Sequence, residues 1–434
     1  MNLKIRPVPR LHGEITVPGD KSITHRALLF GALAEGPSRV KGFLDGGDCR
    51  ATMGCLRALG VVINQTAVDE LVIHGPGLHG WQEPDDVLNC VRSGTTMRLL
   101  AGLLAGQAFF SVLTGEPQLR RRPMDRVVQP LRQMGARIMG RQGGRLPPLS
   151  ISGARLQGTE YVLPIASAQV KSCVLLAGLY AEGPTIVVEP ALSRDHTERM
   201  LRARGVPLES QGTRHTLQGP TLSNLSRLDT VVPGDFSSAA FFLVGALLLS
   251  GSEVLLRGVN TNPTRTGLLD ALRNMGANFS LLDEREEGGE PVADLAVCAQ
   301  PLHGVEVGGD LVPRMIDEFP IFALAATQAQ GITRVRDAAE LRVKESDRIA
   351  TIVEALRILG AHIEARPDGF DIEGPTPLRG TLVDSHGDHR LAMTLAVAGL
   401  LAVGGTTITN AESIPDSFPG FEDRLRLLTE GAWP

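Results

Sequence analysis

The chain has 434 residues, 43% of them hydrophobic and 21% charged, with a formal net charge of −5. A chain of this length can form two or more domains, each with a full hydrophobic core. The net negative charge and the 4% aromatic content disfavour a protein that binds nucleic acid through a basic or stacking surface.

The cysteines and the apolar segments indicate where the protein works. Five cysteines are scattered without a CxxC pair or a His/Cys cluster, which disfavours a structural metal site and favours a reducing compartment. The first residues, MNLKIRPVPRLHG, lack the apolar core of a signal peptide. The longest apolar run, AAFFLVGALLLSG from Ala239, is too short to cross a bilayer. We therefore expect a soluble, cytoplasmic protein.

One pattern recurs six times along the chain: a polar cluster, a helix of small and apolar residues, and a glycine. The copies begin at Asp20, Arg92, Ser167, Gly234, Ile316 and Gly387. They are spaced roughly 70–80 residues apart, which suits a complete supersecondary unit. Because these helices are apolar on nearly all sides, we expect them inside a domain.

Each of these helices is followed by a β-rich segment and then by a second, amphipathic helix. Segments such as PSRVKGFL in the first copy and SEVLLRGV in the fourth favour strands. Second helices such as CRATMGCLRALGVVI carry apolar residues at helical spacing and end at a glycine. The sixth copy is cut short at EDRLRLLTEGAWP. Each unit is thus predicted to combine strands with one inner and one outer helix.

Two nearly identical strings, VPGDKS from Val17 and VPGDFS from Val232, mark the expected domain crossovers. Both place a Pro-Gly turn directly before a helix N-cap. We therefore expect one domain over residues 20–234 and a second, discontinuous domain that combines residues 1–19 with residues 235–434. A single solenoid of six repeats is the alternative.

Cations gather at the amino-terminal ends of the inner helices, where the helix dipole disfavours them. In the first copy, Lys21, His25 and Arg26 follow the expected N-cap Asp20. A bound anion would stabilise both the cations and the helix end, so the pattern indicates phosphate or carboxylate ligands. Taken singly, such residues are more simply solvated charges, N-caps or structural histidines. Their recurrence at one point of the repeated unit favours a binding site.

Two further basic clusters lie outside these helix starts. LRRRPMDR contains Arg120, Arg121, Arg122 and Arg126. In LRVKESDRIA, we expect Lys344 and Arg348 on one helix face at positions i and i+4.

Together these motifs resemble those of the 5-enolpyruvylshikimate-3-phosphate synthase family of enolpyruvyl transferases, along essentially the whole chain. The strings that carry the resemblance are PGDKSITHRALL, SGTTMRLL, LTGEPQLRRRPMDRVVQPLRQMGA, ASAQVKS, SRDHTERML, VPGDFSSAAFF, NPTRTGLLDAL, RVKESDR and GDHRLAM. The resemblance implies an α/β fold, the two-domain inside-out α/β barrel. This fold has six βαβαββ units, three per domain, and an active-site cleft between the domains.

The resemblance also implies a reaction of the shikimate pathway, the route to chorismate and the aromatic amino acids. The enolpyruvyl group of phosphoenolpyruvate passes to the 5-hydroxyl of shikimate 3-phosphate, and phosphate is released. A base takes the hydroxyl proton, an acid protonates the methylene carbon, and cations hold the phosphates and carboxylates. Neither a metal nor an organic cofactor is implied. We expect a monomer without nucleic-acid or membrane partners.

The same resemblance assigns the site residues. Asp317 and Glu345 are implied to be the acid/base pair, assisted by Lys21 and His389. Shikimate 3-phosphate is implied to contact Lys21, Ser22, Arg26, Ser167, Ala168, Gln169, Ser193, Asp317 and Lys344. Phosphoenolpyruvate is implied to contact Lys21, Gly94, Thr95, Arg122, Gln169, Arg348 and Arg390.

The chain departs from the family pattern at several positions. Val91 and Arg92 stand where Gly-Asn is common before SGT, and Glu340 replaces a frequent asparagine. Asp416 replaces a lysine that closes on the site, and Ala168 and His196 replace a serine and a tyrosine of some members. We hypothesise that Arg92 adds a cation beside phosphoenolpyruvate; pairing with a local carboxylate is the alternative.

Two other functions remain to be weighed. The enolpyruvyl transferase that acts on UDP-N-acetylglucosamine has the same fold, but it resembles a KNA start and usually carries a cysteine before its arginine. GEPQLRRRP has no cysteine. A non-catalytic repeat protein that binds anions would explain the fold but not the paired Asp317 and Glu345.

Overall fold

The computed structural model describes residues 1–219 and 225–429, so the last residues of EDRLRLLTEGAWP lie outside the described part. The chain divides into two compact units. Unit 1 comprises Met1–Pro18, Pro233–Glu286 and the chain from Pro291 onward, and unit 2 comprises Gly19–Val232 and Glu287–Glu290. Each unit has its own hydrophobic core.

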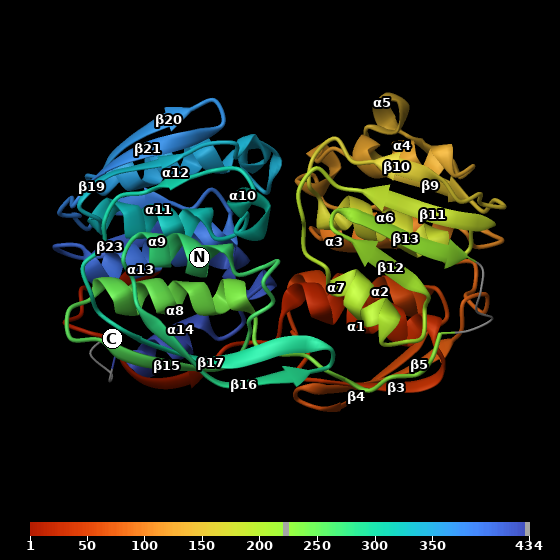
Figure 1. Ribbon diagram of the computed structural model, residues 1–434, viewed down its shortest axis with the longest axis horizontal. Helices are drawn as coiled ribbons and strands as arrows, with labels where there is room; N and C mark the ends of the chain where they lie inside the picture. Colours follow the sequence, from red (N-terminus) through yellow and green to blue (C-terminus); the bar gives the residue numbers. More distant parts are fainter. Residues whose placement is uncertain (220–224, 430–434) are drawn as a thin grey trace. The chain divides into compact units, whose positions relative to one another are not determined.

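Unit 2 contains the first three copies of the predicted pattern (Figure 1). The first has α1 (Lys21–Leu33), β3 (Glu35–Lys41), α2 (Gly47–Ala58), β4 (Val62–Ala67) and β5 (Glu70–Pro76). The second has β6 (Leu88–Asn89), α3 (Gly94–Ala105), β7 (Phe110–Thr114), α4 (Asp125–Gln133), β8 (Arg137–Gly140), the short α5 (Arg141–Gly144) and β9 (Leu146–Ser152). The third has β10 (Glu160–Val162), α6 (Ala168–Gly178), β11 (Gly183–Val188), α7 (His196–Arg202), β12 (Leu208–Gln211) and β13 (Arg214–Gly219), and β14 (Thr230–Val231) follows.

Unit 1 contains the other three copies and the two first strands, β1 (Leu3–Ile5) and β2 (His12–Thr16). The fourth has α8 (Phe236–Leu248), β15 (Glu253–Asn260), α9 (Gly267–Asn274), β16 (Phe279–Glu287) and β17 (Glu290–Cys298). The fifth has β18 (Glu306–Val307), α10 (Leu311–Arg314), α11 (Phe319–Gln328), β19 (Gly331–Val335), α12 (Arg348–Ile358), β20 (His362–Arg366) and β21 (Gly369–Gly374). The sixth has β22 (Leu382–Asp384), α13 (His389–Leu401), β23 (Thr406–Thr409) and α14 (Phe421–Leu428).

The four-stranded sheets repeat one strand order, and the sheet β1-β23-β22 has three strands. In β6-β7-β9-β8, for example, the first pair is parallel and the next two pairs are antiparallel. The first parallel pair needs a crossover, and the inner helix α3 supplies it between β6 and β7. The predicted repeats and the α/β class are confirmed.

At each of the two crossovers, the strand that precedes the inner helix pairs with a sheet of the other unit rather than with the sheet of its own repeat. β2 precedes α1 in the chain but pairs in parallel with β15 of unit 1. β14 precedes α8 but pairs in parallel with β3 of unit 2. β1 pairs antiparallel with β23, so residues from the start of the chain complete two sheets of unit 1.

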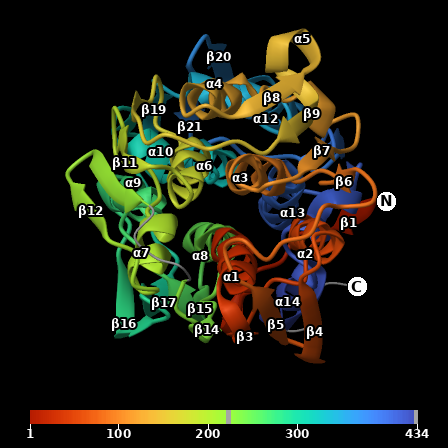
Figure 2. The same ribbon diagram turned by 90° about the vertical axis from the view of Figure 1, so that its right-hand side faces the viewer.

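The inner helices are buried because small and apolar residues cover nearly all their sides. In unit 1, α8, α11 and α13 pack against one another in all three pairings. In unit 2, α3 packs against both α1 and α6, and strands surround these helices (Figure 2). A closed set of three helices contradicts the solenoid alternative, in which each repeat would contact only its sequence neighbours.

Side chains cap most of the inner helices. The expected N-caps Asp20 and Asp235 are confirmed: they accept hydrogen bonds from the backbone N–H of Ile23 (3.0 Å) and Ser237 (2.7 Å). Asp388 caps α13 in the same way. Within residues 1–219 and 225–429, every helix is too short or too polar to cross a membrane.

Candidate active site

In unit 1, polar side chains join the amino-terminal ends of α8, α11 and α13. The N-cap Asp235 of α8 accepts from Nη2 of the buried Arg265 at 2.5 Å. Ser237, in the first turn of α8, donates to Glu318, which directly precedes α11. Glu318 Oε1 lies 4.0 Å from Nη1 of Arg390, in the first turn of α13. The three helix starts therefore meet in one buried polar cluster.

Arg348, the first residue of α12, holds three carboxylates. Its Nε donates to Asp388 Oδ2 at 2.7 Å, its Nη2 to Glu345 Oε2 at 2.8 Å, and its Nη1 to Asp317 Oδ1 at 3.4 Å. Arg348 is 1% exposed. Burial disfavours its charged form, but Asp388, Glu345 and Asp317 outweigh burial and raise the Arg348 pKa. The expected acid/base pair is thus held by a single guanidinium.

Arg390 and His389 begin α13 beside this cluster. Nη2 of Arg390 lies 3.6 Å from Asp317 Oδ2. His389 is buried next to the N-cap Asp388. Burial raises the pKa of Asp388, but Arg348 and then His389 more than offset it, so the Asp388 pKa lies below its usual value. The structure therefore brings the expected Asp317, Glu345, Arg348, His389 and Arg390 together.

The prediction that Lys344 and Arg348 share a helix face is wrong. Lys344 follows a short 3₁₀ helix over Ala339–Val343, and α12 begins only at Arg348. The reason is Asp347, which accepts a hydrogen bond from the N–H of Ala350 at 3.1 Å and so caps α12.

Lys344 nevertheless lies in the electrostatic field of the same carboxylates. Its Nζ is 4.0 Å from Glu340 Oε1, so the residue that replaces the family's asparagine is its neighbour. Burial lowers the Lys344 pKa, and the negative charges of Glu340, Asp317 and Glu345 oppose that shift. Lys344 is thus a cation whose proton is held less firmly than usual.

In unit 2, the starts of α3 and α6 lie side by side around Gly94. Gln169 Nε2 donates to Thr95 Oγ1 at 2.8 Å, and Gln169 Oε1 accepts from Nη1 of Arg98. A Cβ atom at position 94 would lie 3.0 Å from Nη1 of Arg122, so this guanidinium covers the glycine. The structure therefore gathers four expected residues of the phosphoenolpyruvate site.

Arg98 was not predicted as a member of this site. It is buried, and it donates to Gln169 and to the carbonyl oxygen of Pro123 (3.2 Å). The sequence could have indicated this residue, because Arg98 stands one helical turn after Gly94 in SGTTMRLL and so lies on the same face of the helix.

The first turn of α1 carries a neutralised lysine. Lys21 Nζ contacts Asp48 Oδ2 of α2 at 3.0 Å, and both side chains are about one-sixth exposed. Ser22 offers its carbonyl oxygen to Nη1 of Arg26 at 3.0 Å. Lys21 is therefore partly accessible and held by a carboxylate of its own unit.

Arg26 points into unit 2. It is 3% exposed, and it donates from Nε to Thr197 Oγ1 (2.6 Å) and from Nη2 to Ser172 Oγ (2.7 Å). Burial lowers the Arg26 pKa to about 10, against the negative charges of Glu198 and Asp20. The guanidinium remains charged at neutral pH.

The remaining expected contacts lie at α6 and after β11. Ser167 caps α6 by accepting from the N–H of Val170 at 3.5 Å, and Ala168 is the first residue of that helix. Both are partly exposed. Ser193 is buried, and its hydroxyl donates to Glu189.

Arg92 and Val91 form an exposed turn before α3. Arg92 Nε donates to Glu116 Oε2 at 2.8 Å, and both side chains are about two-fifths exposed. This contact supports the local-carboxylate alternative for Arg92. Val91 has a φ of +51°, in the left-handed region that favours glycine.

The two groups of residues differ in chemistry. Unit 1 presents carboxylates beside buried guanidinium groups, and these cations favour the charged form of the neighbouring acids. Unit 2 presents two helix starts, Arg122, Arg98 and Lys21, which suit phosphate or carboxylate oxygens.

Comparisons with known proteins identify the family. The sequence profile of EPSP synthase (3-phosphoshikimate 1-carboxyvinyltransferase) matches residues 5–425. The 3-phosphoshikimate 1-carboxyvinyltransferase of Citrifermentans bemidjiense is 54% identical, over 99% of both chains, and that of Bacillus cereus is 51% identical, over 98% of this chain and 99% of the relative. A solved EPSP synthase from Acinetobacter baumannii superposes with a TM-score of 0.87 at 46% identity, over 98% of both chains. The chain therefore belongs to the EPSP synthase family.

Proposed function

We propose that this chain transfers the enolpyruvyl group of phosphoenolpyruvate to the 5-hydroxyl of shikimate 3-phosphate and releases phosphate. The structural observation that carries the proposal is Arg348, which holds Asp317 and Glu345 on one buried guanidinium. The reaction needs one proton removed from a hydroxyl and one added to a methylene carbon, so two neighbouring carboxyl groups suit it. The names of the relatives favour this acceptor over UDP-N-acetylglucosamine.

In this proposal Asp317 and Glu345 are the acid/base pair: they remove the proton of the 5-hydroxyl and supply the proton that the methylene carbon receives. Lys21 and His389 assist. Gly94, Thr95, Arg122, Gln169, Arg348 and Arg390 bind phosphoenolpyruvate together with Lys21. Ser22, Arg26, Ser167, Ala168, Gln169, Ser193 and Lys344 bind shikimate 3-phosphate together with Lys21 and Asp317. The proposal keeps the predicted division into a domain of residues 20–234 and a domain of residues 1–19 and 235–434.

The carboxylates that hold Arg348 also explain how proton transfer is prepared. A guanidinium between two carboxylates favours the charged form of both. When the carboxylate of phosphoenolpyruvate approaches Arg348 and Arg390, it adds negative charge beside Asp317 and Glu345. That charge favours protonation of one of the two acids, which produces one acid and one base.

We also infer that the enzyme works as a cytoplasmic monomer. All five cysteines are free thiols, and four of them are buried, as is usual in reducing compartments. Multi-angle light scattering after size-exclusion chromatography measures the mass of the native particle. A mass near 46.3 kDa supports the monomer, and twice that mass contradicts it.

A phosphate-release assay tests the function. We expect turnover when shikimate 3-phosphate and phosphoenolpyruvate are both present, and no release from either substrate alone. UDP-N-acetylglucosamine replaces shikimate 3-phosphate in the control. Release with the nucleotide sugar and none with shikimate 3-phosphate would contradict the proposal.

A further inference from the structure

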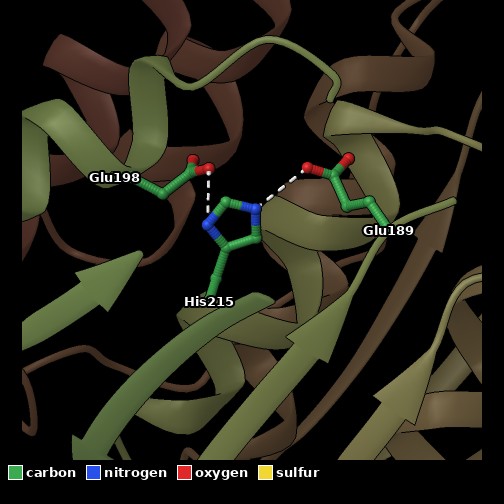
Figure 3. Close-up of side chains that lie close together, drawn as sticks. All are labelled: Glu189, Glu198 and His215. Carbon is green, nitrogen blue, oxygen red and sulfur yellow. Dashed lines mark hydrogen bonds and ion pairs between the residues drawn. The ribbon is translucent and has the colours of Figure 1, made fainter. Parts of the chain in front are cut away.

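A buried group of charged residues in unit 2 lies outside the proposed contacts with either substrate. Glu189 follows β11, Glu198 lies on α7 and His215 on β13, and all three side chains point toward one another (Figure 3). His215 Nε2 lies 3.0 Å from Glu189 Oε1, and its Nδ1 lies 3.7 Å from Glu198 Oε1. Each of the three is at most 2% exposed.

Two glutamates and a histidine could coordinate a metal ion, but a lysine already lies among them. Lys171 of α6 places its Nζ 2.6 Å from Glu189 Oε1 and 2.7 Å from Glu198 Oε1. Its side chain is fully buried. The ammonium group therefore occupies the position of a cation between the two carboxylates. We interpret the group as a closed charge cluster rather than a metal site.

Lys171 and Glu189 of this cluster favour their ionised forms although they are buried. Burial disfavours the charged form of Lys171, but Glu198 and Glu189 outweigh burial and raise the Lys171 pKa. Burial likewise opposes the ionised form of Glu189, but His215, Lys171 and Ser193 together hold its pKa below the usual value. Lys171 and Glu189 form a buried ion pair, and this pair holds its hydrogen-bond partners in position, because a displacement of either residue would leave a buried charge unpaired.

One of those partners is Ser193. Its hydroxyl donates to Glu189 Oε2, and its carbonyl oxygen accepts from Lys171 Nζ at 3.3 Å. The hydroxyl and the carbonyl oxygen of Ser193 are therefore held by the Lys171–Glu189 pair.

Arg26 lies next to the charge cluster. Ser172 follows Lys171 on α6, and Thr197 precedes Glu198 on α7. These two hydroxyl groups lie 2.6 Å apart, and each accepts a hydrogen bond from the Arg26 guanidinium. The helices α6 and α7 therefore supply Lys171 and Glu198 of the charge cluster and, at the adjacent positions, the two hydroxyl groups that bind Arg26.

We propose that Glu189 is a positioning residue for shikimate 3-phosphate: paired with Lys171, it fixes the hydroxyl group of Ser193 in the orientation that binds this substrate. The inference rests on the proposed function, in which Ser193 contacts shikimate 3-phosphate. Glu189 is buried, and it contacts Ser193, Lys171 and His215, so in this proposal it acts through Ser193. Its loss should change substrate affinity rather than the chemical step.

Glu189→Gln is the central variant, because it keeps the shape and removes the charge. Ser193 donates to Oε2 and Lys171 to Oε1, and glutamine keeps an oxygen at only one of these two positions. With that oxygen bound to the Lys171 ammonium group, Ser193 loses its fixed orientation. We expect the KM for shikimate 3-phosphate to rise at least tenfold. The kcat and the KM for phosphoenolpyruvate should change less than threefold. Leu217→Ala, a buried change on β13, is the control for lost stability and should leave all three constants unchanged.

A double-mutant cycle with Ser193→Ala tests whether Glu189 acts through Ser193. We expect Glu189→Gln to add less than twofold to the KM of Ser193→Ala, because the group that it positions is already absent. Multiplicative effects would overturn the proposal, as would a Leu217→Ala variant with the same rise in KM. Glu189→Asp keeps a negative charge that pairs with Lys171, but its shorter side chain moves the acceptor oxygen away from the Ser193 hydroxyl. It should fold even if the glutamine variant does not, and an unchanged KM in it would also overturn the proposal.

Calorimetric titration with shikimate 3-phosphate distinguishes a failure of this inference from a failure of the proposed function. Wild-type protein that does not bind shikimate 3-phosphate would contradict the proposed function and this inference with it. Wild-type protein and Glu189→Gln that bind it equally well would contradict the inference alone.

Discussion

Val91 adopts a φ of +51°, a region in which a β-branched side chain is strained by about 1–3 kcal/mol. The strain is maintained by two backbone contacts: the Val91 N–H donates to Asn89 Oδ1, and the Val91 carbonyl accepts from Glu116. The sequence comparison with the family anticipated a glycine at this position.

We therefore expect Val91→Gly to raise the free energy of unfolding by about 1 kcal/mol, the relieved strain less the added freedom of the unfolded chain. Urea denaturation followed by circular dichroism measures it. Val162→Gly, at an exposed strand residue, is the control and should lower stability. If Val91→Gly were as destabilising as the control, the strain would not exist.

His25 is buried on α1, with Nδ1 2.7 Å from Thr52 Oγ1. Burial, aided by Lys21 and Arg26 and opposed by Asp48, lowers its pKa to about 3, whereas the unfolded chain has about 6.5. Between these pH values the unfolded state binds a proton that the folded state does not. Stability therefore falls as the pH drops from about 6.5 toward 3, by up to ~1.4 kcal/mol per pH unit.

We expect His25→Asn to remove this term, since asparagine keeps a partner for Thr52 but does not titrate. Unfolding free energies at pH 7, 6 and 5 should fall less steeply for the variant than for wild type, by roughly one bound proton. Parallel curves would show that His25 is protonated in the folded state.

Asp317 and Glu345 share one guanidinium, so removing the charge of either should affect chemistry more than binding. We expect Asp317→Asn and Glu345→Gln to lower kcat by about 10²-fold or more, with substrate affinities within roughly tenfold. Steady-state kinetics and titration calorimetry measure the two effects. Near-normal turnover of Glu345→Gln would contradict its assigned role.

At the scale of elements, two helix caps of the same type have different surroundings. Asp347 caps α12, is about two-fifths exposed and pairs with Arg342 at the surface, whereas Asp388 caps α13, is fully buried and pairs with the buried Arg348. We expect Asp347→Ala to cost about 1 kcal/mol, the usual value of a cap. Asp388→Ala should cost about 3 kcal/mol, because it also weakens the pairing of a buried guanidinium. Equal losses would mean that the Arg348 contact adds nothing to stability.

The elements also show how far the sequence alone reaches. The six inner helices and the caps Asp20 and Asp235 were predictable, because periodicity and capping are local properties. The start of α12 was not, because Ser346 and Asp347 are both favoured N-cap residues and the capping geometry decides between them. Arg98 and the Lys171–Glu189–Glu198 cluster were missed for another reason: their partners come from separate helices and strands. The strands β1 and β2 pair with β23 and β15, about 240 to 400 residues away, and such distant partners leave no local signal.

At the scale of the molecule, unit 2 is nearly continuous in sequence and unit 1 is not. We expect residues 19–232 expressed alone to fold cooperatively. Residues 233–434 alone should not, because β15 and β23 would lack β2 and β1. Joining residues 1–18 to the end of this fragment through a flexible linker should restore folding, as measured by circular dichroism and thermal unfolding. A stable 233–434 fragment would show that the first two strands are dispensable.

The exchanged strands impose an order on folding during synthesis. The ribosome completes unit 2, apart from one short turn, when about half of the chain has been made. β1 must wait for β23, which follows about 400 residues later, and at roughly 5–20 residues per second this takes about 20–80 s. During that interval the nascent chain carries a finished domain behind an unpaired leading strand. Cells that make this protein therefore depend on keeping β1 unaggregated until the last sheet is translated.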